Sequence, residues 1–375
     1  MINSGELYNI FLQNGISFFT GVPDSLLKDF CSYVTDKAGS DNHKISTNEG
    51  SALALAAGYY LSTGKPALVY MQNSGLGNSI NPLLSLADSE VYGIPVLLMI
   101  GWRGEPDVKD EPQHIKQGRV MIKMLEAMDI PYSIIERDTP DLKGVITSIC
   151  GLIKENNCPA ALIVREGTFE KYEMKSDEKV QFDLTREDAL TLILDNLDEE
   201  SIIVTTTGKT SRELYEYRER KKQSHEKDFL TVGSMGHSSQ IALGIALQKK
   251  GRQVYVIDGD GALLMHLGAL AMNGTSAPEN FKHVLINNGS HESVGGQPTA
   301  GFNVNFPEMA KACGYNFYST AETSEELLNE IGKLKSVKGP AFLEIKVNKG
   351  SRPELGRPKT KPYQNKEIFM KLLSK

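Results

Sequence analysis

The sequence predicts an α/β protein built from two doubly wound parallel-sheet domains, with no middle domain between them. Short apolar and β-branched runs alternate with helical patterns, which is typical of parallel sheets with crossover helices. A charged, poorly apolar stretch over residues 169–184 interrupts the alternation, which then resumes. The length of 375 residues also suits two ordinary domains.

In the first half, we expect a strand wherever a short apolar, β-branched run occurs. These runs are residues 16–19, 67–71, 96–100, 132–135 and 160–164. Residues 50–61 and 142–153 lie between such runs and carry helix-forming residues at core-facing spacing. The pattern predicts a first domain over residues 1–170.

The second half begins with a helix-start signal. Thr185 is followed three residues later by Asp188, and this pair resembles a capping box. We therefore expect residues 171–184 to link the domains and residues 185–375 to form the second domain. Its predicted strands are residues 202–206, 253–257, 283–286, 315–318 and 341–345.

Composition and charge argue against several classes of protein. Lys and Arg total 41 against 47 Asp and Glu, and the net charge of -6 has the wrong sign for a broad nucleic-acid footprint. The four cysteines form no CxxC pair and have no histidine at metal spacing, so a zinc site finds no support. The longest apolar stretch, residues 94–100, is too short to span a bilayer, and the first residues lack a signal-peptide pattern. We expect a cytoplasmic location, with neither membrane nor nucleic acid as a partner.

The most informative segment covers residues 254–290 and joins two buried strands of the predicted sheet. The first strand ends in Gly259-Asp260-Gly261, where glycines permit a sharp turn and close approach to the backbone. We expect a helix from Ala262, and the N-terminus of that helix would attract anions. The segment therefore predicts a binding site for phosphate groups.

Oxygen-bearing groups follow both of these strands. Asp260 offers a carboxylate, Asn288 an amide oxygen and Ser290 a backbone carbonyl. A diphosphate held at this turn would need a hard cation to bridge its oxygens, and such cations prefer oxygen ligands. The three groups fit an octahedral magnesium site that phosphate and water complete.

With its GDG turn and the later Asn287-Asn288 pair, the sequence resembles the thiamine diphosphate enzyme superfamily. The resemblance implies that the cofactors are thiamine diphosphate and magnesium, and that Asp260, Asn288 and the Ser290 carbonyl bind the metal. It also implies that the first domain binds the pyrimidine ring of the cofactor and the second its diphosphate. The alternative is a Gly-Asp turn with an unrelated asparagine pair.

The first domain offers a candidate for the residue that activates the cofactor. Glu49 precedes SALALAAGYYLSTG, a small-residue helix whose packing would bury the surroundings of the carboxylate. In the superfamily, a glutamate just before an Ala-rich helix hydrogen-bonds the pyrimidine ring, and Glu49 matches that place. If this segment stood alone, the default interpretation of Glu49 would be an acid that complements the dipole of the helix.

Further segments resemble the cofactor loops of the superfamily. Residues 72–78 match the turn against the pyrimidine ring, and residues 233–236 match the loop that holds the cofactor in its bent conformation. Residues 207–210 are not a P-loop, because the required first glycine would fall at Ile203; by resemblance they lie against the diphosphate. Each segment also has a purely structural explanation, as a tight turn or, for Met235, as core filler. The expected cofactor contacts are Asn73, Gly75, Thr207, Gly208, Gly233, Met235, Gly259, Gly261 and Ala262.

Within the superfamily, the sequence most resembles the phosphonopyruvate decarboxylase subfamily. The Glu49 motif comes first and the GDG motif second, with no inserted domain, whereas pyruvate decarboxylase and acetolactate synthase relatives are longer. The resemblance extends to residues 21–25, 101–114, 206–214 and 295–299. It implies decarboxylation of 3-phosphonopyruvate to phosphonoacetaldehyde and carbon dioxide, a step of phosphonate biosynthesis. Sulfopyruvate decarboxylase is the nearest alternative, and a non-catalytic nucleotide-binding protein is a more distant one.

The residues around the substrate are less defined. We expect Asp24 to be an active-site carboxylate and His114 to be a proton donor or substrate contact, although a lone histidine is more often structural. A second anionic group on the substrate would need polar and cationic partners. The candidates are Ser25, Arg103, Lys209 and Arg212.

The two motifs also bear on assembly. The Glu49 and GDG motifs lie in different predicted domains, and the superfamily builds its site from two subunits. We therefore expect a homodimer or a higher homo-oligomer with the site at the subunit interface.

Overall fold

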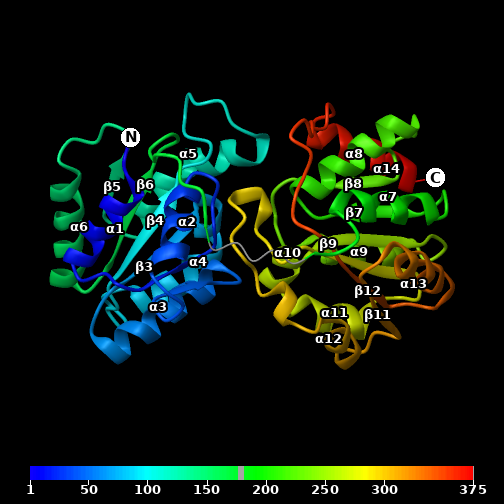
Figure 1. Cartoon of the computed structure of the whole chain (residues 1–375), viewed down its shortest axis with the longest axis horizontal. Helices are drawn as coiled ribbons and strands as arrows, with labels where there is room; N and C mark the ends of the chain where they lie inside the picture. The colour runs from blue at the N-terminus through cyan, green and yellow to red at the C-terminus, as the bar shows by residue number, and fades with distance from the viewer. Residues whose placement is uncertain (176–180, 375) are drawn as a thin grey trace. The chain divides into compact units, whose positions relative to one another are not determined.

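The computed structural model describes residues 1–175 and 181–374. In these residues, twelve strands form two six-stranded sheets, and every neighbouring pair of strands is parallel. Each sheet belongs to one of two compact units, Met1–Glu178 with Ser293–Gln297, and Lys179–Glu292 with Pro298–Lys375. Helices flank both sheets (Figure 1). The predicted fold class, with two parallel-sheet α/β domains and no middle domain, is confirmed.

In the first unit, helices and strands alternate along the chain. Its strands are β1 (Phe19–Gly21), β2 (His43–Ile45), β3 (Ala67–Gln72), β4 (Val96–Gly101), β5 (Tyr132–Ile135) and β6 (Pro159–Val164). Its helices are α1 (Ser4–Gln13), α2 (Lys28–Lys37), α3 (Glu49–Thr63), η1 (Asn73–Gly75), α4 (Leu76–Pro82), η2 (Leu83–Ala87), α5 (Pro112–Ala127) and α6 (Leu142–Asn156). The strand order is β2-β1-β3-β4-β6-β5.

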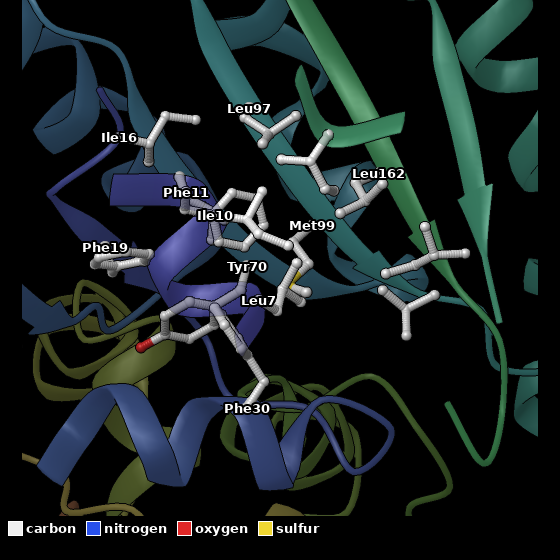
Figure 2. Packing of buried hydrophobic residues seen from close by; sticks show 14 of the residues in the cluster. Leu7, Ile10, Phe11, Ile16, Phe19, Phe30, Tyr70, Leu97, Met99 and Leu162 are labelled. Carbon is white, nitrogen blue, oxygen red and sulfur yellow. The ribbon is translucent and has the colours of Figure 1, made fainter. Parts of the chain in front are cut away.

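Successive residues of the central strands point to opposite faces of this sheet and belong to two different hydrophobic cores. Leu97 and Met99 of β4 pack with the buried side chains of α1, α2 and α6, including Phe11 and Phe30, as Figure 2 shows. Leu98, between them, belongs to a second core with the buried side chains of α3, α4 and α5. A strand covered on both faces reads as a continuous apolar run, which explains why the sequence revealed it.

The second unit repeats this plan. Its strands are β7 (Ile202–Thr205), β8 (Asp228–Leu230), β9 (Val254–Gly259), β10 (Phe281–Asn287), β11 (Phe317–Ala321) and β12 (Ala341–Lys346). Its helices are α7 (Arg186–Asn196), α8 (Lys209–Lys221), α9 (Ser238–Gln248), α10 (Asp260–Met265), α11 (Ala269–Ser276), η4 (Gly301–Asn303), α12 (Phe306–Ala312), α13 (Ser324–Ser336) and α14 (Pro362–Leu373), while η3 (Glu292–Val294) spans the division between the units. The predicted capping box of Thr185 and Asp188 is confirmed at the start of α7.

Both sheets have the same strand order. In the order β11-β12-β10-β9-β7-β8, the strands β7 to β12 take the places that β1 to β6 have in the first sheet. The second strand pairs on one side of the first strand and the third strand on the other, so the chain reverses its direction across the sheet there. Open parallel sheets bind ligands outside the carboxyl ends of the strands at such a reversal. The segments after β1 and β3, and after β7 and β9, are therefore the places to look for a site.

Some elements differ from the prediction. The edge strands β2 and β8 were not predicted, because each has three residues and includes polar ones, such as His43 and Asp228. β1 begins at Phe19, where the predicted strand ends, and β11 begins two residues after its predicted start.

The division of the chain also differs in detail from the expected one. Tyr172, in the expected linker, hydrogen-bonds Asp29 and Asp36 of α2, and residues 293–297 are grouped with the first unit. Residues 176–180 of that linker lie outside the described residues. None of the described helices is both long enough and apolar enough to cross a membrane.

Candidate active site

The carboxyl end of β9 carries the GDG turn. β9 ends at Gly259 and α10 begins at Asp260, two residues before the expected start of the helix. The Asp260 side chain is buried and accepts hydrogen bonds from the Asn288 backbone N–H, at 3.4 Å, and from the Thr299 hydroxyl. Burial raises the pKa of Asp260 to about 6. A bound cation would compensate the lost hydration of this carboxylate.

The loop after β10 lies beside Asp260. Asn287 donates from Nδ2 to the Gly301 carbonyl at 2.9 Å, and a side chain at Gly301 would collide with both Asn287 and Asp260. The Asn288 side-chain Oδ1 accepts from the Ser290 backbone N–H at 3.1 Å. The structure thus brings together Asp260, Asn288 and Ser290, the three predicted metal ligands.

Two other predicted cofactor loops of the second unit meet each other. Gly208 precedes α8 with a φ of 97°, and the Thr207 hydroxyl accepts from the Gly233 backbone N–H at 3.0 Å. Gly233 has a φ of 69°, in the left-handed region that favours glycine. The Met235 methyl carbon lies 3.4 Å from the place a Cβ on Gly261 would take. These loops therefore gather near the carboxyl ends of β7 and β9.

A histidine for which no role was predicted is buried at the same place. The His291 ring lies 3.3 Å from the position of a Cβ on Gly261. Burial lowers the pKa of His291 to about 4, so the ring is neutral near pH 7. A side chain at Gly261 would crowd both His291 and Met235, so the glycine leaves these two side chains undisturbed.

Glu49 is the first residue of α3, and its side chain is only 5% exposed. The Asn48 side chain caps the helix by accepting from the Ser51 backbone N–H at 2.8 Å. The Glu49 carboxylate accepts from Asn78 Nδ2 at 2.9 Å. A side chain at Gly75 would collide with this carboxylate, so glycine allows η1 to approach α3.

Polar side chains connect the carboxyl ends of β1 and β3. The fully buried Asp24 carboxylate accepts from Gln72 Nε2 at 2.7 Å and from the Leu26 backbone N–H at 3.0 Å. Burial raises the pKa of Asp24. Asn73 donates to the Arg103 carbonyl at 2.7 Å, while its buried Oδ1 has no hydrogen-bond partner among the described residues.

Two predicted residues of the first unit follow β4. Arg103 makes a two-point contact with Asp110, at 2.8 and 2.5 Å, and donates from Nη1 to the Ser25 hydroxyl at 2.7 Å. His114 is buried near the start of α5, where burial and the nearby Arg103 lower its pKa to about 4. The structure brings Ser25 and Arg103 together, but Asp110 already occupies two donors of the guanidinium. Their roles toward a substrate stay predictions.

Both predicted cations of the second unit also have partners. Lys209 donates to Glu292 Oε1 at 2.8 Å. Arg212 donates from Nε to the Gly356 carbonyl at 2.6 Å and from Nη2 to the Leu355 carbonyl. Neither side chain is therefore a free positive charge, and their contacts to a substrate stay predictions.

Arg186 was missed by sequence reasoning. It donates to both oxygens of Glu213, at 2.8 and 2.6 Å, and to Glu292 Oε2 at 2.5 Å. Burial opposes the charge on Arg186, but these two carboxylates raise its pKa above the ordinary value. Its position beside a helix cap gave no hint of this role, because Glu292 is 106 residues away in the sequence.

Two family models match the chain. The N-terminal TPP binding domain of thiamine pyrophosphate enzymes matches residues 6–127, and the C-terminal TPP binding domain matches residues 206–345. A phosphonopyruvate decarboxylase of Streptomyces viridochromogenes is 33% identical over 97% of this chain and 93% of its own length. The chain belongs to the thiamine pyrophosphate enzyme family.

Other members of the thiamine pyrophosphate enzyme family are also similar to this chain. A phosphonopyruvate decarboxylase of Streptomyces hygroscopicus is 34% identical over 97% of this chain and 92% of its own. A sulfopyruvate decarboxylase of Methanosarcina acetivorans is 29% identical over 92% of this chain and 91% of its own. Family membership makes thiamine pyrophosphate, or thiamine diphosphate, the cofactor of this chain.

The residues at the carboxyl ends of β7 and β9 fit a diphosphate with a hard cation. Space is open above Gly259, where a Cβ would find no atom nearer than Thr206 Cγ2 at 3.9 Å. The Thr206 and Ser290 hydroxyls are buried without a hydrogen-bond partner among the described residues. The three predicted ligands, Asp260, Asn288 and the Ser290 carbonyl, would all bind a metal through oxygen, as magnesium prefers. Among the described residues, no group of three His, Cys, Asp or Glu side chains lies together in a way that could hold a metal.

Proposed function

We propose that the chain decarboxylates 3-phosphonopyruvate to phosphonoacetaldehyde and carbon dioxide. The similarity to two phosphonopyruvate decarboxylases over 97% of this chain carries the proposal. The buried Asp260 carboxylate and the open space above Gly259 support it, because the carboxylate fits a hard cation and the open space fits the diphosphate that this cation would bridge. In this proposal the protein is a carboxy-lyase that works in the cytoplasm in phosphonate biosynthesis.

The second unit would hold the diphosphate and its metal. Asp260, Asn288 and the Ser290 carbonyl would bind magnesium, which prefers oxygen ligands. The backbone at the GDG turn and at the loop before α8 would hold the phosphates. The residues of these two segments are Gly259, Gly261, Ala262, Thr207 and Gly208. Gly233 and Met235 would contact the remainder of the cofactor.

The first unit would hold the pyrimidine ring. Glu49 would hydrogen-bond the ring in a setting that excludes water, since its side chain is only 5% exposed, and Asn73 and Gly75 would line the same place. When bound, thiamine diphosphate supplies the electron sink that accepts the electron pair left as carbon dioxide departs. Because burial raises the pKa of Asp24, its carboxyl group would hold a proton more readily and could deliver it to the product.

The phosphonate group of the substrate would need polar and cationic partners. Ser25 and Arg103 are joined by a hydrogen bond of 2.7 Å. Burial raises the pKa of Asp24, and the nearby Arg103 charge offsets part of that rise, so these three groups share one region of the first unit. His114, Lys209 and Arg212 are further candidates. A phosphonate would have to share these cations with the protein carboxylates and carbonyls that already bind them.

We also propose that the chain forms a homo-oligomer whose active site lies at the subunit interface. Helix α3, which begins with Glu49, exposes large apolar side chains at Leu55 and Leu61, which are 42% and 74% exposed. Ile80 and Leu84, in the following helical segments, are also exposed. The helices that carry them, α3, α4 and η2, contact one another, and neighbouring exposed apolar side chains are typical of protein interfaces. A second copy of the chain would cover them.

The test measures carbon dioxide and aldehyde release from phosphonopyruvate, sulfopyruvate and pyruvate, each with and without thiamine diphosphate and magnesium. We expect turnover that depends on both cofactors and is fastest with phosphonopyruvate. If sulfopyruvate is turned over fastest, the proposed substrate is wrong and sulfopyruvate takes its place, while the proposed cofactor site stands. The similarity to the sulfopyruvate decarboxylase of Methanosarcina acetivorans supports that second candidate. If thiamine diphosphate binds but none of the three acids is turned over, the proposal that the chain is a decarboxylase is refuted.

A further inference from the structure

Glu292 lies in a buried network of charges in the second unit. Its carboxylate receives Arg186 Nη1 at 2.5 Å and Lys209 Nζ at 2.8 Å, while Arg186 also binds both oxygens of Glu213. The side chains of Arg186, Glu213 and Glu292 are 7%, 1% and 12% exposed. Burying charged groups such as Arg186 and Glu213 is costly. Glu292 also contacts Asn288, a residue outside this network, and this contact indicates a role for the four charged groups.

The Asn288 side chain makes this contact. Its Nδ2 donates to Glu292 Oε2 at 2.9 Å, while its Oδ1 accepts from the Ser290 backbone N–H at 3.1 Å. An asparagine amide has a donor end and an acceptor end, and rotating the group exchanges them. An ionised carboxylate only accepts, so Glu292 permits only the orientation in which Nδ2 faces it and Oδ1 points elsewhere.

Arg186 and Lys209 maintain the form of Glu292 that sets this orientation. The Arg186 guanidinium and the Lys209 ammonium group donate to its carboxylate oxygens at 2.5 and 2.8 Å and stabilise the negative charge on Glu292. Two positive and two negative side chains balance within the network. The network therefore orients Asn288 without adding net charge to the region around Asp260.

We propose that Glu292 and Arg186 are positioning residues for the cation site. Glu292 holds the Asn288 amide so that its oxygen, and not its NH₂ group, is available to a divalent cation, and Arg186 holds Glu292. This inference rests on the proposed magnesium site of Asp260, Asn288 and Ser290. Outer partners of this kind commonly change metal affinity by 10–100-fold, because they fix the geometry of the ligand.

The test uses Mn²⁺ as the probe, in the full chain with saturating thiamine diphosphate, and measures free Mn²⁺ by electron paramagnetic resonance. Glu292→Gln keeps the shape of the side chain, but its amide can donate as well as accept, so only the Ser290 backbone N–H still favours one orientation of Asn288. We expect Mn²⁺ affinity to fall by roughly tenfold or more. Arg186→Met should also lower the affinity for Mn²⁺, provided that this variant folds.

A second background separates positioning from general support of the structure. Asn288→Asp has two equivalent oxygens and therefore no orientation to fix. In that background, Glu292→Gln should cause no further loss of Mn²⁺ affinity. An equal loss in both backgrounds would mean that the two residues act independently, and positioning would be wrong.

Two further variants complete the experiment. Asp228→Asn breaks a buried ion pair with Arg218, at 2.8 and 2.9 Å in the same unit, and should lower the melting temperature without changing Mn²⁺ affinity. Asp260→Asn tests the proposed cation site itself. If Asp260→Asn leaves Mn²⁺ affinity unchanged, the site proposal fails. If it weakens binding and Glu292→Gln does not, only the positioning role fails.

Discussion

Replacing Glu49 by glutamine separates its proposed catalytic role from a purely structural one. The glutamine amide oxygen can still accept from Asn78 Nδ2, a bond of 2.9 Å in the native chain. A hydrogen bond to a charged group contributes about 1.5–3 kcal/mol and a neutral one about 0.5–1.5 kcal/mol, so the exchange costs about 1 kcal/mol. Loss of the negative charge at the start of α3 adds about 0.3–1 kcal/mol. The expected loss of folding free energy is therefore about 1–2 kcal/mol.

The expected loss of turnover is larger. Removing a general acid–base contribution lowers the rate by about 10²–10⁴-fold, which corresponds to about 2.7–5.4 kcal/mol at 1.36 kcal/mol for each factor of ten. A loss of 1–2 kcal/mol leaves a domain with roughly 5–15 kcal/mol of stability almost entirely folded. Unfolding therefore cannot account for such a loss of turnover.

The assay measures carbon dioxide release from phosphonopyruvate at saturating thiamine diphosphate and magnesium, together with melting of both proteins. Glu6→Gln is the matched control, because Glu6 is an acid in the first turn of α1 in the same unit. It should show the small helix-dipole effect on melting and no loss of turnover. Turnover by Glu49→Gln in simple proportion to its folded fraction would refute the catalytic role and leave Glu49 as a helix-start acid.

Three further predictions concern the first unit. Gly75→Ala places a Cβ against the Glu49 carboxylate, so we expect turnover to fall by about 10²-fold, because small displacements of reacting groups have effects of that size; unchanged turnover would mean that η1 moves freely. The pKa of His114 is lowered from 6.5 to about 4, so the unfolded chain binds a proton more readily than the folded chain as pH falls below 6.5, and acid destabilises the fold through this residue. Calorimetry should therefore show that the melting temperature falls less for His114→Gln than for the native chain when the pH is lowered from about 7 to about 4. Equal falls in melting temperature would contradict the lowered pKa of His114. Leu55→Glu with Leu61→Glu charges the exposed apolar face of α3, so sedimentation should find a smaller assembly than for the native chain, and an unchanged size would exclude this face as the subunit contact.

The elements that could be predicted are those whose burial is evident from a short run of apolar residues. β4 and β6 are covered on both faces, so they appear as apolar runs, and α3 begins at Glu49 within one residue of the predicted helix. The edge strand β8 contains Asp228, whose buried charge is matched by Arg218 of α8. An isolated polar residue of this kind argues against a strand unless its distant partner is known.

The candidate site divides in the same way. Asp260, Asn288 and Glu49 stand in short motifs, and the structure gives them buried, hydrogen-bonded positions. Arg186 belongs to no motif, because its role depends on Glu213 and Glu292, which are 27 and 106 residues away. Contacts at such separations depend on how the whole sheet folds, which local spacing does not reveal.

The shared strand order explains why the motifs come in matching pairs. In each sheet the third strand pairs beside the first, at the point where the chain reverses direction. Asn73 and Gly75 follow β3 in the first sheet, as Asp260 and Gly261 follow β9 in the second. In both places, a glycine allows close approach and a polar side chain is buried where a ligand would meet the backbone. One fold used twice therefore provides two comparable sheet edges. In the proposed function, different side chains at the ends of the corresponding strands fit the first edge to the pyrimidine ring and the second to the diphosphate.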